Sequence, residues 1–192
     1  VAAIHKSIGK DRPVAANRLL ETISVMWKQA AILGHIPDEK ANIILGIRRY
    51  KEKPRDRFLS KEEWVKLLEA LETTKGEKFQ KEAIKLDLEL GFRHSEIVAL
   101  KWDYVDLERR EIRLPDTKSG RPFRQPLTDK AVQILSDLPR FNQWVFPSTV
   151  LQGNHISAVE KLLKRVCKNA GIEDFRVHDI RRSVGCSVLA AT

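Results

Sequence analysis

Residues 91–102, GFRHSEIVALKW, place an arginine directly after the end of a helix. Apolar side chains precede this stretch at helical spacing, at Phe79, Ala83, Leu86 and Leu90. Gly91 is typical of the residue that ends such a helix, and Arg93 follows it by two positions, so its guanidinium leaves a tight turn. A guanidinium fixed in this way can bind a phosphate through two parallel hydrogen bonds, whereas pairing with the nearby Glu96 is the commoner role for one such arginine.

The segments on either side of this turn predict a mainly α protein with one small antiparallel β-sheet. Residues 111–114 and 123–127 alternate polar and apolar side chains around the turn residues 117–120, which indicates a β-hairpin. Ser60 with Glu63 forms a capping-box pattern, and Thr128 is a typical N-cap. We expect helices from Pro13 to about Gly34, from Ser60 through Leu71, from Phe79 to Leu90, from Thr128 to Leu138, from Ile156 to Ala170 and from about His178 onward.

The composition excludes wholesale disorder and favours a polyanionic partner. The chain has 192 residues, 42% of them hydrophobic, with 35 Lys and Arg against 26 Asp and Glu and a formal charge of +9. Nucleic acid is the first candidate partner and an anionic membrane surface the second. No apolar run approaches the ~18 residues that span a bilayer, so we expect no membrane segment and a soluble protein in the cytosol. Cys167 and Cys186 are too few for a disulfide framework, and we expect both to be buried or half-buried.

A run of basic residues lies between the first helix and the capping box. Six positive and two negative side chains give residues 48–57 a charge of +4. We expect an extended, exposed linker that contacts a phosphate backbone, although a solvated loop is the commoner meaning of a lone charge run. The expected DNA backbone contacts are Arg48, Arg49, Lys51, Lys53, Arg55, Arg57 and, further along the chain, Arg182.

Three further basic residues could act on a phosphodiester. Lys118 lies at the tip of the predicted hairpin, where a flexible ammonium could follow and protonate a leaving oxygen. His178 and Arg181 are three residues apart on a predicted helix, so both project from one face. Taken singly, each of these residues is more commonly an ordinary surface group, and only their order and contexts together are specific.

Together, these groups resemble the tyrosine recombinases, the phage-integrase type of site-specific DNA recombinase. The first family box matches Gly91, Arg93, Ser95, Glu96, Leu100 and Trp102; the hairpin lysine box matches Thr117, Lys118, Ser119, Gly120, Pro126 and Leu127; the histidine-x-x-arginine box matches His178, Asp179, Ile180, Arg181 and Arg182. The resemblance implies three regions: C-terminal helices of a SAM-like core-binding domain over 1–47, a basic linker over 48–58 and a truncated catalytic domain over 59–192.

The resemblance also implies a catalytic role for each matched residue. Arg93 and Arg181 would clamp the scissile phosphate, His178 would assist proton transfer, and Lys118 would be the general acid for the 5′-oxygen. Glu96 would orient the arginine loop. No metal or other cofactor is implied, and Asp103 and Asp106 are better interpreted as turn and cap residues than as metal ligands. The implied partners are a duplex DNA recombination site, a homo-tetramer on that DNA, and accessory DNA-bending or directionality proteins.

One part of the family pattern is not found in this sequence. Family members carry a nucleophilic tyrosine after the histidine-x-x-arginine helix and cut DNA through a 3′-phosphotyrosyl intermediate. The tyrosines here, Tyr50 and Tyr104, do not occupy that place, so we expect a fragment that binds a phosphodiester without forming the covalent bond. The alternatives are a non-catalytic duplex-DNA-binding module and, with less support, a binder of RNA or anionic membranes.

Overall fold

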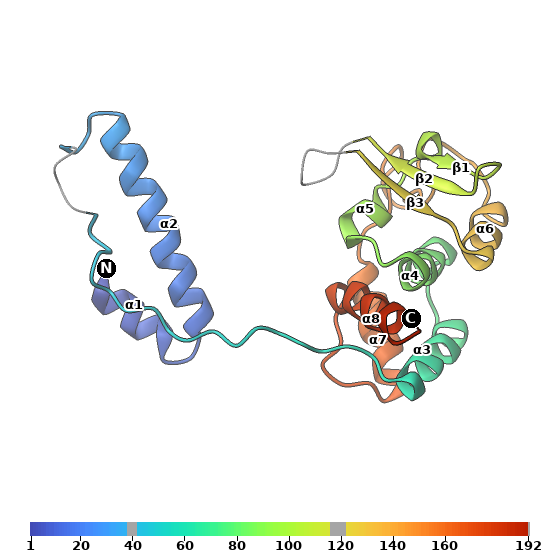
Figure 1. The fold of residues 1–192 in the computed structure, drawn as a ribbon, viewed down its shortest axis with the longest axis horizontal. Helices are drawn as coiled ribbons and strands as arrows, with labels where there is room; N and C mark the ends of the chain where they lie inside the picture. The colour runs from blue at the N-terminus through green and yellow to red at the C-terminus, as the bar shows by residue number, and fades with distance from the viewer. Residues whose placement is uncertain (38–41, 116–121, 192) are drawn as a thin grey trace. The chain divides into compact units, whose positions relative to one another are not determined.

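The computed structural model describes residues 1–37, 42–115 and 122–191. The chain forms two compact units, Val1–Arg55 and Asp56–Thr192, so the boundary falls inside the predicted basic linker (Figure 1). Within the described part of the chain, no helix combines the length and the apolar character needed to cross a membrane.

The first unit consists of α1 (Ala2–Gly9), which the sequence analysis missed, and α2 (Pro13–Ile32), which begins at Pro13 as predicted. The Asn17 side chain of α2 fixes the start of the basic run: its Nδ2 donates to the Tyr50 carbonyl at 2.9 Å, and its Oδ1 accepts from the Tyr50 amide at 2.9 Å. The Tyr50 ring lies so close to Gly9 that a Cβ there would be 2.1 Å from it. The residues around Tyr50 are therefore packed against α1 and α2 and do not form a flexible linker.

The second unit confirms the mainly α fold with a small antiparallel sheet. The sheet has three strands in the order β1-β2-β3, and the register pairs Ile112 with Gln125 and Leu114 with Phe123. The predicted hairpin strands are present, whereas its turn, 117–120, lies outside the described residues. The elements are α3 (Lys61–Thr73), α4 (Lys78–Leu90), α5 (His94–Val98), the 3-10 helix η1 (Trp102–Tyr104), β1 (Val105–Asp106), β2 (Glu111–Leu114), β3 (Phe123–Pro126), α6 (Asp129–Ser136), α7 (Val159–Ala170) and α8 (Val177–Ala191).

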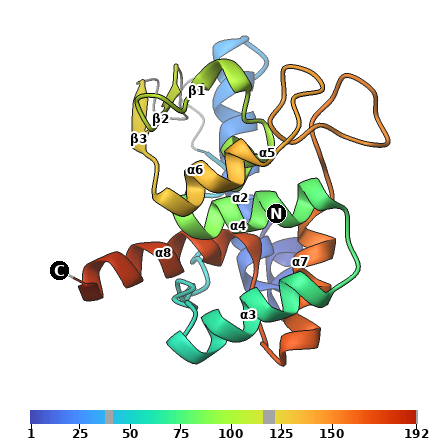
Figure 2. The ribbon, with the colours of Figure 1, turned by 90° about the vertical axis from the view of Figure 1, so that its right-hand side faces the viewer.

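Helix α4 is the centre of the second unit. The sheet lies on one side of α4, and α3, α7 and α8 lie on the other (Figures 1 and 2). Helices α5, α6, α7 and α8 all pack directly against α4. Its apolar positions are almost wholly buried, which makes the end of α4 a fixed point for the residues that follow: Phe79, Ala83, Ile84, Leu86, Leu88 and Leu90.

The helix ends follow the predicted signals with one exception. The Ser60–Glu63 capping box and the Thr128 cap are both formed. The helix predicted from Ile156 begins only at Val159. Ala158 has a left-handed backbone with φ of 59°, and the Ile156 amide donates to the Phe146 carbonyl at 2.9 Å, so this residue pairs with a neighbouring segment instead of entering the helix.

The two cysteines have different environments. Cys167 is buried against the core, and burial raises the pKa of its thiol to about 11. Cys186 is exposed, so the expectation that both would be at least half-buried was wrong for this residue. The reason is that the C-terminal turns of α8 extend beyond the packed helices (Figure 2).

Gly91 and Gly171 allow a matched test of helix termination. Both end a helix in the left-handed region, with φ of 62° and 65°. A Cβ on Gly91 would lie 3.0 Å from the Val184 side chain of α8, whereas a Cβ on Gly171 would meet nothing within 4 Å. We expect Gly171→Ala to lower the free energy of unfolding by about 1–2 kcal/mol, from backbone strain alone.

The Gly91→Ala variant should lose about 1–3 kcal/mol more, because the added methyl also pushes α8 away from α4. Urea unfolding followed by tryptophan fluorescence measures both losses. Equal losses for the two variants would show that close contact between α4 and α8 at Gly91 contributes nothing to stability.

Candidate functional site

The turn between α4 and α5 holds Arg93 by two contacts with one side chain. Glu96 Oε2 accepts from the Arg93 amide at 3.0 Å, and Glu96 Oε1 accepts from Arg93 Nη1 at 2.9 Å. Arg93 thus makes the carboxylate pairing that is common for such residues. Its side chain nevertheless keeps 41% of its surface exposed, so the other face of the guanidinium is open to a ligand.

Helix α8 brings Arg181 to the same turn. Arg181 Nη1 donates to the Gly91 carbonyl at 2.9 Å, a contact between residues 90 apart in sequence. The position of α8 is fixed at its start by Asp179, which is fully buried and whose Oδ2 accepts from the Arg176 amide at 2.9 Å. Ser183 Oγ accepts from the Leu59 amide at 3.0 Å and adds a second anchor. Arg181 therefore contacts the turn at the end of α4 that also carries Arg93.

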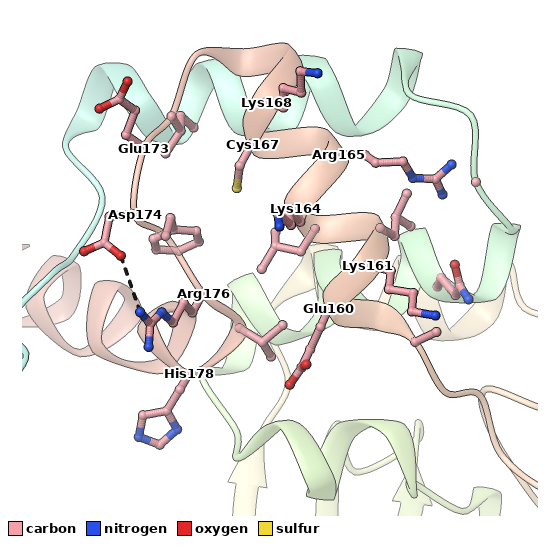
Figure 3. Close-up of a pocket in the computed structure, with 18 of the residues that line it drawn as sticks. Glu160, Lys161, Lys164, Arg165, Cys167, Lys168, Glu173, Asp174, Arg176 and His178 are labelled. Atoms are coloured by element: carbon pink, nitrogen blue, oxygen red, sulfur yellow. Dashed lines mark ion pairs between the residues drawn. The ribbon is translucent and has the colours of Figure 1, made fainter. Parts of the chain in front are cut away.

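Of the other two predicted catalytic residues, only His178 lies within the described structure. His178 lies three residues before Arg181 on α8, is exposed, and lines a pocket of about 1510 Å³ beside α7. Figure 3 shows it at the opposite end of this pocket from Lys168, near the Asp174–Arg176 ion pair of 3.7 Å. Lys118 lies outside the described residues.

A smaller pocket of about 250 Å³ adjoins Arg181. The end of α4, strand β3 and one face of α8 form its walls, which combine apolar side chains with the polar groups of Gln125 and Arg181. The rings of Phe92 and Phe123 meet edge to face with centroids 6.1 Å apart. This contact brings the first residue of β3 against the residue that precedes Arg93.

Asp87 is a charged residue of this region that the sequence analysis missed. It lies one turn before Gly91 on α4 and is only 2% exposed. Burial raises the pKa of its carboxyl from 3.8 to about 8; the Arg181 charge opposes this rise and the Glu96 charge adds to it. Its spacing could have revealed it, because Asp87 lies four residues after Ala83 and three before Leu90, on the apolar face of the helix.

A second missed group is the histidine beside Arg93. His94 begins α5 and is half-buried. Burial lowers the pKa of its imidazole, and the charge of Glu160 on α7 opposes that effect. His94 is therefore predominantly neutral at pH 7.

The cations predicted to bind the DNA backbone differ in their exposure and in their ion pairs. Arg49 pairs with Glu21 at 3.0 Å, and Arg57 Nη1 donates to Glu63 at 2.9 Å while its guanidinium lies 5.8 Å from the Phe175 ring centroid. Arg182 is half-buried, with Nη1 enclosed and without a hydrogen-bond partner in the described structure. Arg57 is thus not the exposed cation that we expected of the basic run, because it packs within the second unit, as Arg182 also does.

Four cations of the basic run are exposed to solvent, and one of them, Arg49, is paired with Glu21. Arg48, Lys51 and Lys53 make no ion pair within residues 1–37, 42–115 and 122–191. Among these same residues, no three His, Cys, Asp or Glu side chains are grouped closely enough to hold a metal ion.

Comparisons with known proteins agree on one family. Residues 57–191 match the model of the phage integrase family. The integrase of Salmonella phage P22 is 31% identical over 117 residues, which cover 54% of this chain and 30% of that protein. The shufflon-specific DNA recombinase of Escherichia coli is 32% identical over 97 residues, 50% of this chain and 24% of that one. The matches thus span less than a third of either relative.

Solved structures share the fold at lower sequence identity. A lambda integrase dimer bound to a COC′ core site superimposes with a TM-score of 0.75 at 20% identity, over 96% of this chain and 70% of that one. The Tn1549 transposon integrase in complex with circular intermediate DNA gives a TM-score of 0.68 at 15% identity, over 99% and 71%. Because the family match covers well over half of the residues and includes all three sequence boxes, the chain belongs to the phage integrase family.

Proposed function

We propose that this protein is part of a site-specific DNA recombinase that cleaves and rejoins DNA strands through a 3′-phosphotyrosyl intermediate. The observation that carries the proposal is the hydrogen bond from Arg181 to the Gly91 carbonyl, at the turn that holds Arg93. This contact supports a shared role for the two arginines, because it ties Arg181 to a residue two positions before Arg93. The curated relatives, an integrase and a DNA recombinase, support the same reaction class.

In the proposed reaction, the two arginines bind the non-bridging oxygens of one phosphodiester. Nucleophilic attack on phosphorus gathers negative charge on these oxygens, and a preorganised cationic donor stabilises that charge by about 10²- to 10³-fold in rate. Glu96 supplies the preorganisation for Arg93, since it fixes both the backbone and the guanidinium. His178 assists proton transfer from the first turn of α8.

We propose Lys118 as the general acid that protonates the 5′-oxygen leaving group. In sequence it precedes Phe123 by five residues, and the Phe123 ring contacts Phe92, the neighbour of Arg93. That contact places the first residue of β3 beside the turn that carries Arg93, which supports the proposal. A flexible ammonium suits this role because it can donate a proton, whereas a guanidinium holds its protons too tightly.

The nucleophile of the proposed reaction is not among residues 1–192. Tyr50 packs against Gly9 and His5 in the first unit, and Tyr104 is half-buried in η1, where it packs against the core. We therefore propose that these 192 residues bind the diester but do not form the covalent bond. Rejoining from a phosphotyrosyl bond conserves the energy of the broken linkage and needs no ATP.

The proposed partners are duplex DNA and further copies of the protein. Structures of fold relatives include a dimer on a core site and a lambda integrase tetramer bound to a Holliday junction. We propose a tetramer on DNA in the cytoplasm of a bacterial cell, with accessory DNA-bending or directionality proteins. Residues 1–47 would belong to the core-binding domain, 48–58 to the linker and 59–192 to the catalytic domain.

Replacing either arginine tests the proposed active site. The protein is produced from the complete reading frame that contains these residues and mixed with nicked suicide duplexes from the DNA flanking its gene. We expect Arg93→Ala and Arg181→Ala each to slow covalent adduct formation by about 10²- to 10³-fold, because each removes one donor to the developing charge. Denaturing gels measure the adduct, and binding of the same duplexes should fall much less.

Arg109→Ala is the control, since this side chain is 70% exposed and its recorded ion pair is with Asp106. It should leave the adduct rate unchanged. If the unsubstituted protein binds its site and forms no adduct, the chain is a DNA-binding module and not a recombinase. A binding loss equal to the loss of adduct in both arginine variants would also favour the module.

The exposed part of the basic run predicts a specific salt dependence. Each phosphate contact contributes about 0.9 to the slope of log affinity against log salt concentration. Replacing Arg48, Lys51 and Lys53 by Gln should therefore reduce this slope by about 2–3 for duplex DNA, measured by fluorescence anisotropy. Joint replacement of Arg57 and Glu63 by Gln should not change it, because that pair is neutral overall. Equal slopes for the triple variant and the unsubstituted protein would show that these three cations do not contact DNA.

A further inference from the structure

Asp87 is a buried acid behind the proposed phosphate site. It lies on α4 with 2% of its surface exposed, and its Oδ1 has no hydrogen-bond partner in the described structure. The backbone around it is fixed, since its own carbonyl accepts from the Gly91 amide at 2.8 Å. The same Gly91 offers its carbonyl to Arg181. One helical turn thus links the buried acid to the arginine that faces the diester.

Two charges from neighbouring elements act on this carboxyl. The Arg181 guanidinium on α8 favours its ionised form, and the Glu96 carboxylate on α5 disfavours it. Burial outweighs the attraction of Arg181 and raises the pKa of Asp87 to about 8. At pH 7 the side chain is therefore mostly a neutral acid, and it ionises at moderately alkaline pH.

We propose that Asp87 is a positioning residue for the phosphate site: as a neutral acid it leaves the charge of Arg181 to the bound diester, and as a carboxylate it competes with the diester for that charge. This inference rests on the proposed function, because it concerns the same arginine. Glu96 already offsets much of the charge of Arg93. When Asp87 is neutral, Arg181 therefore attracts an anion more strongly than Arg93 does.

Thermodynamic linkage makes the effect reciprocal. If ionised Asp87 weakens diester binding by some factor, then a bound diester raises the pKa of Asp87 by the logarithm of that factor. Ionised Asp87 and a bound diester are both negative and repel each other, so ionisation of Asp87 weakens diester binding. Couplings between sites are commonly about 5- to 150-fold, and the lower end suits an arginine whose side chain is exposed to solvent.

Dimethyl phosphate is a suitable probe, because it is a diester that remains a monoanion throughout the neutral and alkaline range. Its binding to the full chain is followed by NMR of the Arg93 and Arg181 side-chain Nε–H signals. We expect affinity to fall about five- to tenfold between about pH 7 and about pH 9.5, as Asp87 ionises. Carbon-13 NMR of the Asp87 carboxyl should show its pKa rising by about 0.7 to 1 when the probe is saturating.

Asp87→Asn separates this effect from other titrations, because the amide has the shape of the neutral acid and does not ionise. The variant should bind dimethyl phosphate as the unsubstituted protein does near pH 7 and should lose the alkaline fall. Asp137→Asn, the same change at an exposed position, should retain the fall. The carboxyl titration of the unsubstituted protein tests the inference even if Asp87→Asn folds poorly.

The outcomes distinguish the two proposals. Binding with an affinity that is flat above pH 7, or an alkaline fall that persists in Asp87→Asn, would overturn the role of Asp87 and leave the proposed function intact. Titration of the Asp87 carboxyl near 4 would do the same. Failure of dimethyl phosphate to move either arginine signal at any pH would overturn the proposed phosphate site, and the inference with it.

Stability gives an independent prediction for the same residue. The folded protein retains a proton on Asp87 up to about pH 8, whereas the unfolded chain releases it near pH 4. Between these values the folded state binds more protons, so the contribution of Asp87 to the free energy of unfolding decreases as pH rises. Asp87→Asn removes that decrease, and its Tm relative to the unsubstituted protein should increase from about pH 5 to about pH 8. The Tm difference of Asp137→Asn should stay constant; a constant difference for Asp87→Asn would contradict the assignment.

Discussion

The hydrogen bond from Arg181 Nη1 to the Gly91 carbonyl, at 2.9 Å, is the contact on which the rest of the site depends. It forms only if α4 ends at Gly91 in a left-handed conformation and if α8 packs closely enough that Val184 meets the glycine without a side chain between them. The first condition is local and the second is a long-range contact, and together they fix a guanidinium from the last helix at the turn that carries Arg93. The proposed phosphate site thus depends on the packing of α8 against α4.

The two arginines near this contact have different acidic neighbours, and this difference affects how each could bind an anion. Glu96 is paired with Arg93 and limits how freely that guanidinium can move. Asp87 lies in the protein interior, where desolvation keeps it largely protonated at neutral pH. Arg93 is therefore held in place by a carboxylate, whereas the positive charge of Arg181 is not neutralised by the protonated Asp87. Preorganised donors of this kind stabilise negative charge without the cost of reorienting at the moment of reaction.

The basic run between the units combines structural and binding roles. Its net charge indicates contact with a polyanion, but the structure assigns some of these cations to internal pairs, with Arg49 on Glu21 and Arg57 on Glu63. The pair with Glu21 holds the start of the run to the first unit, and the pair with Glu63 holds its end to the second unit. The cations left exposed between them are the ones available to a phosphate backbone. Counting charges in sequence therefore overestimates the number of cations that the segment can offer to DNA.

The sequence by itself determined the parts that depend on local chemistry. Gly91 as a helix end, the Ser60–Glu63 box, the Thr128 cap, the paired strands and the three family boxes follow from neighbouring residues. Only the tertiary structure decided which side chains meet: it joined Arg181 to the Arg93 turn, buried Asp87, enclosed part of Arg182 and left Cys186 exposed. It also drew Ile156 out of its predicted helix by pairing it with Phe146. Burial, pKa and long-range pairing depend on what other segments place against a residue, and a linear pattern does not contain that information.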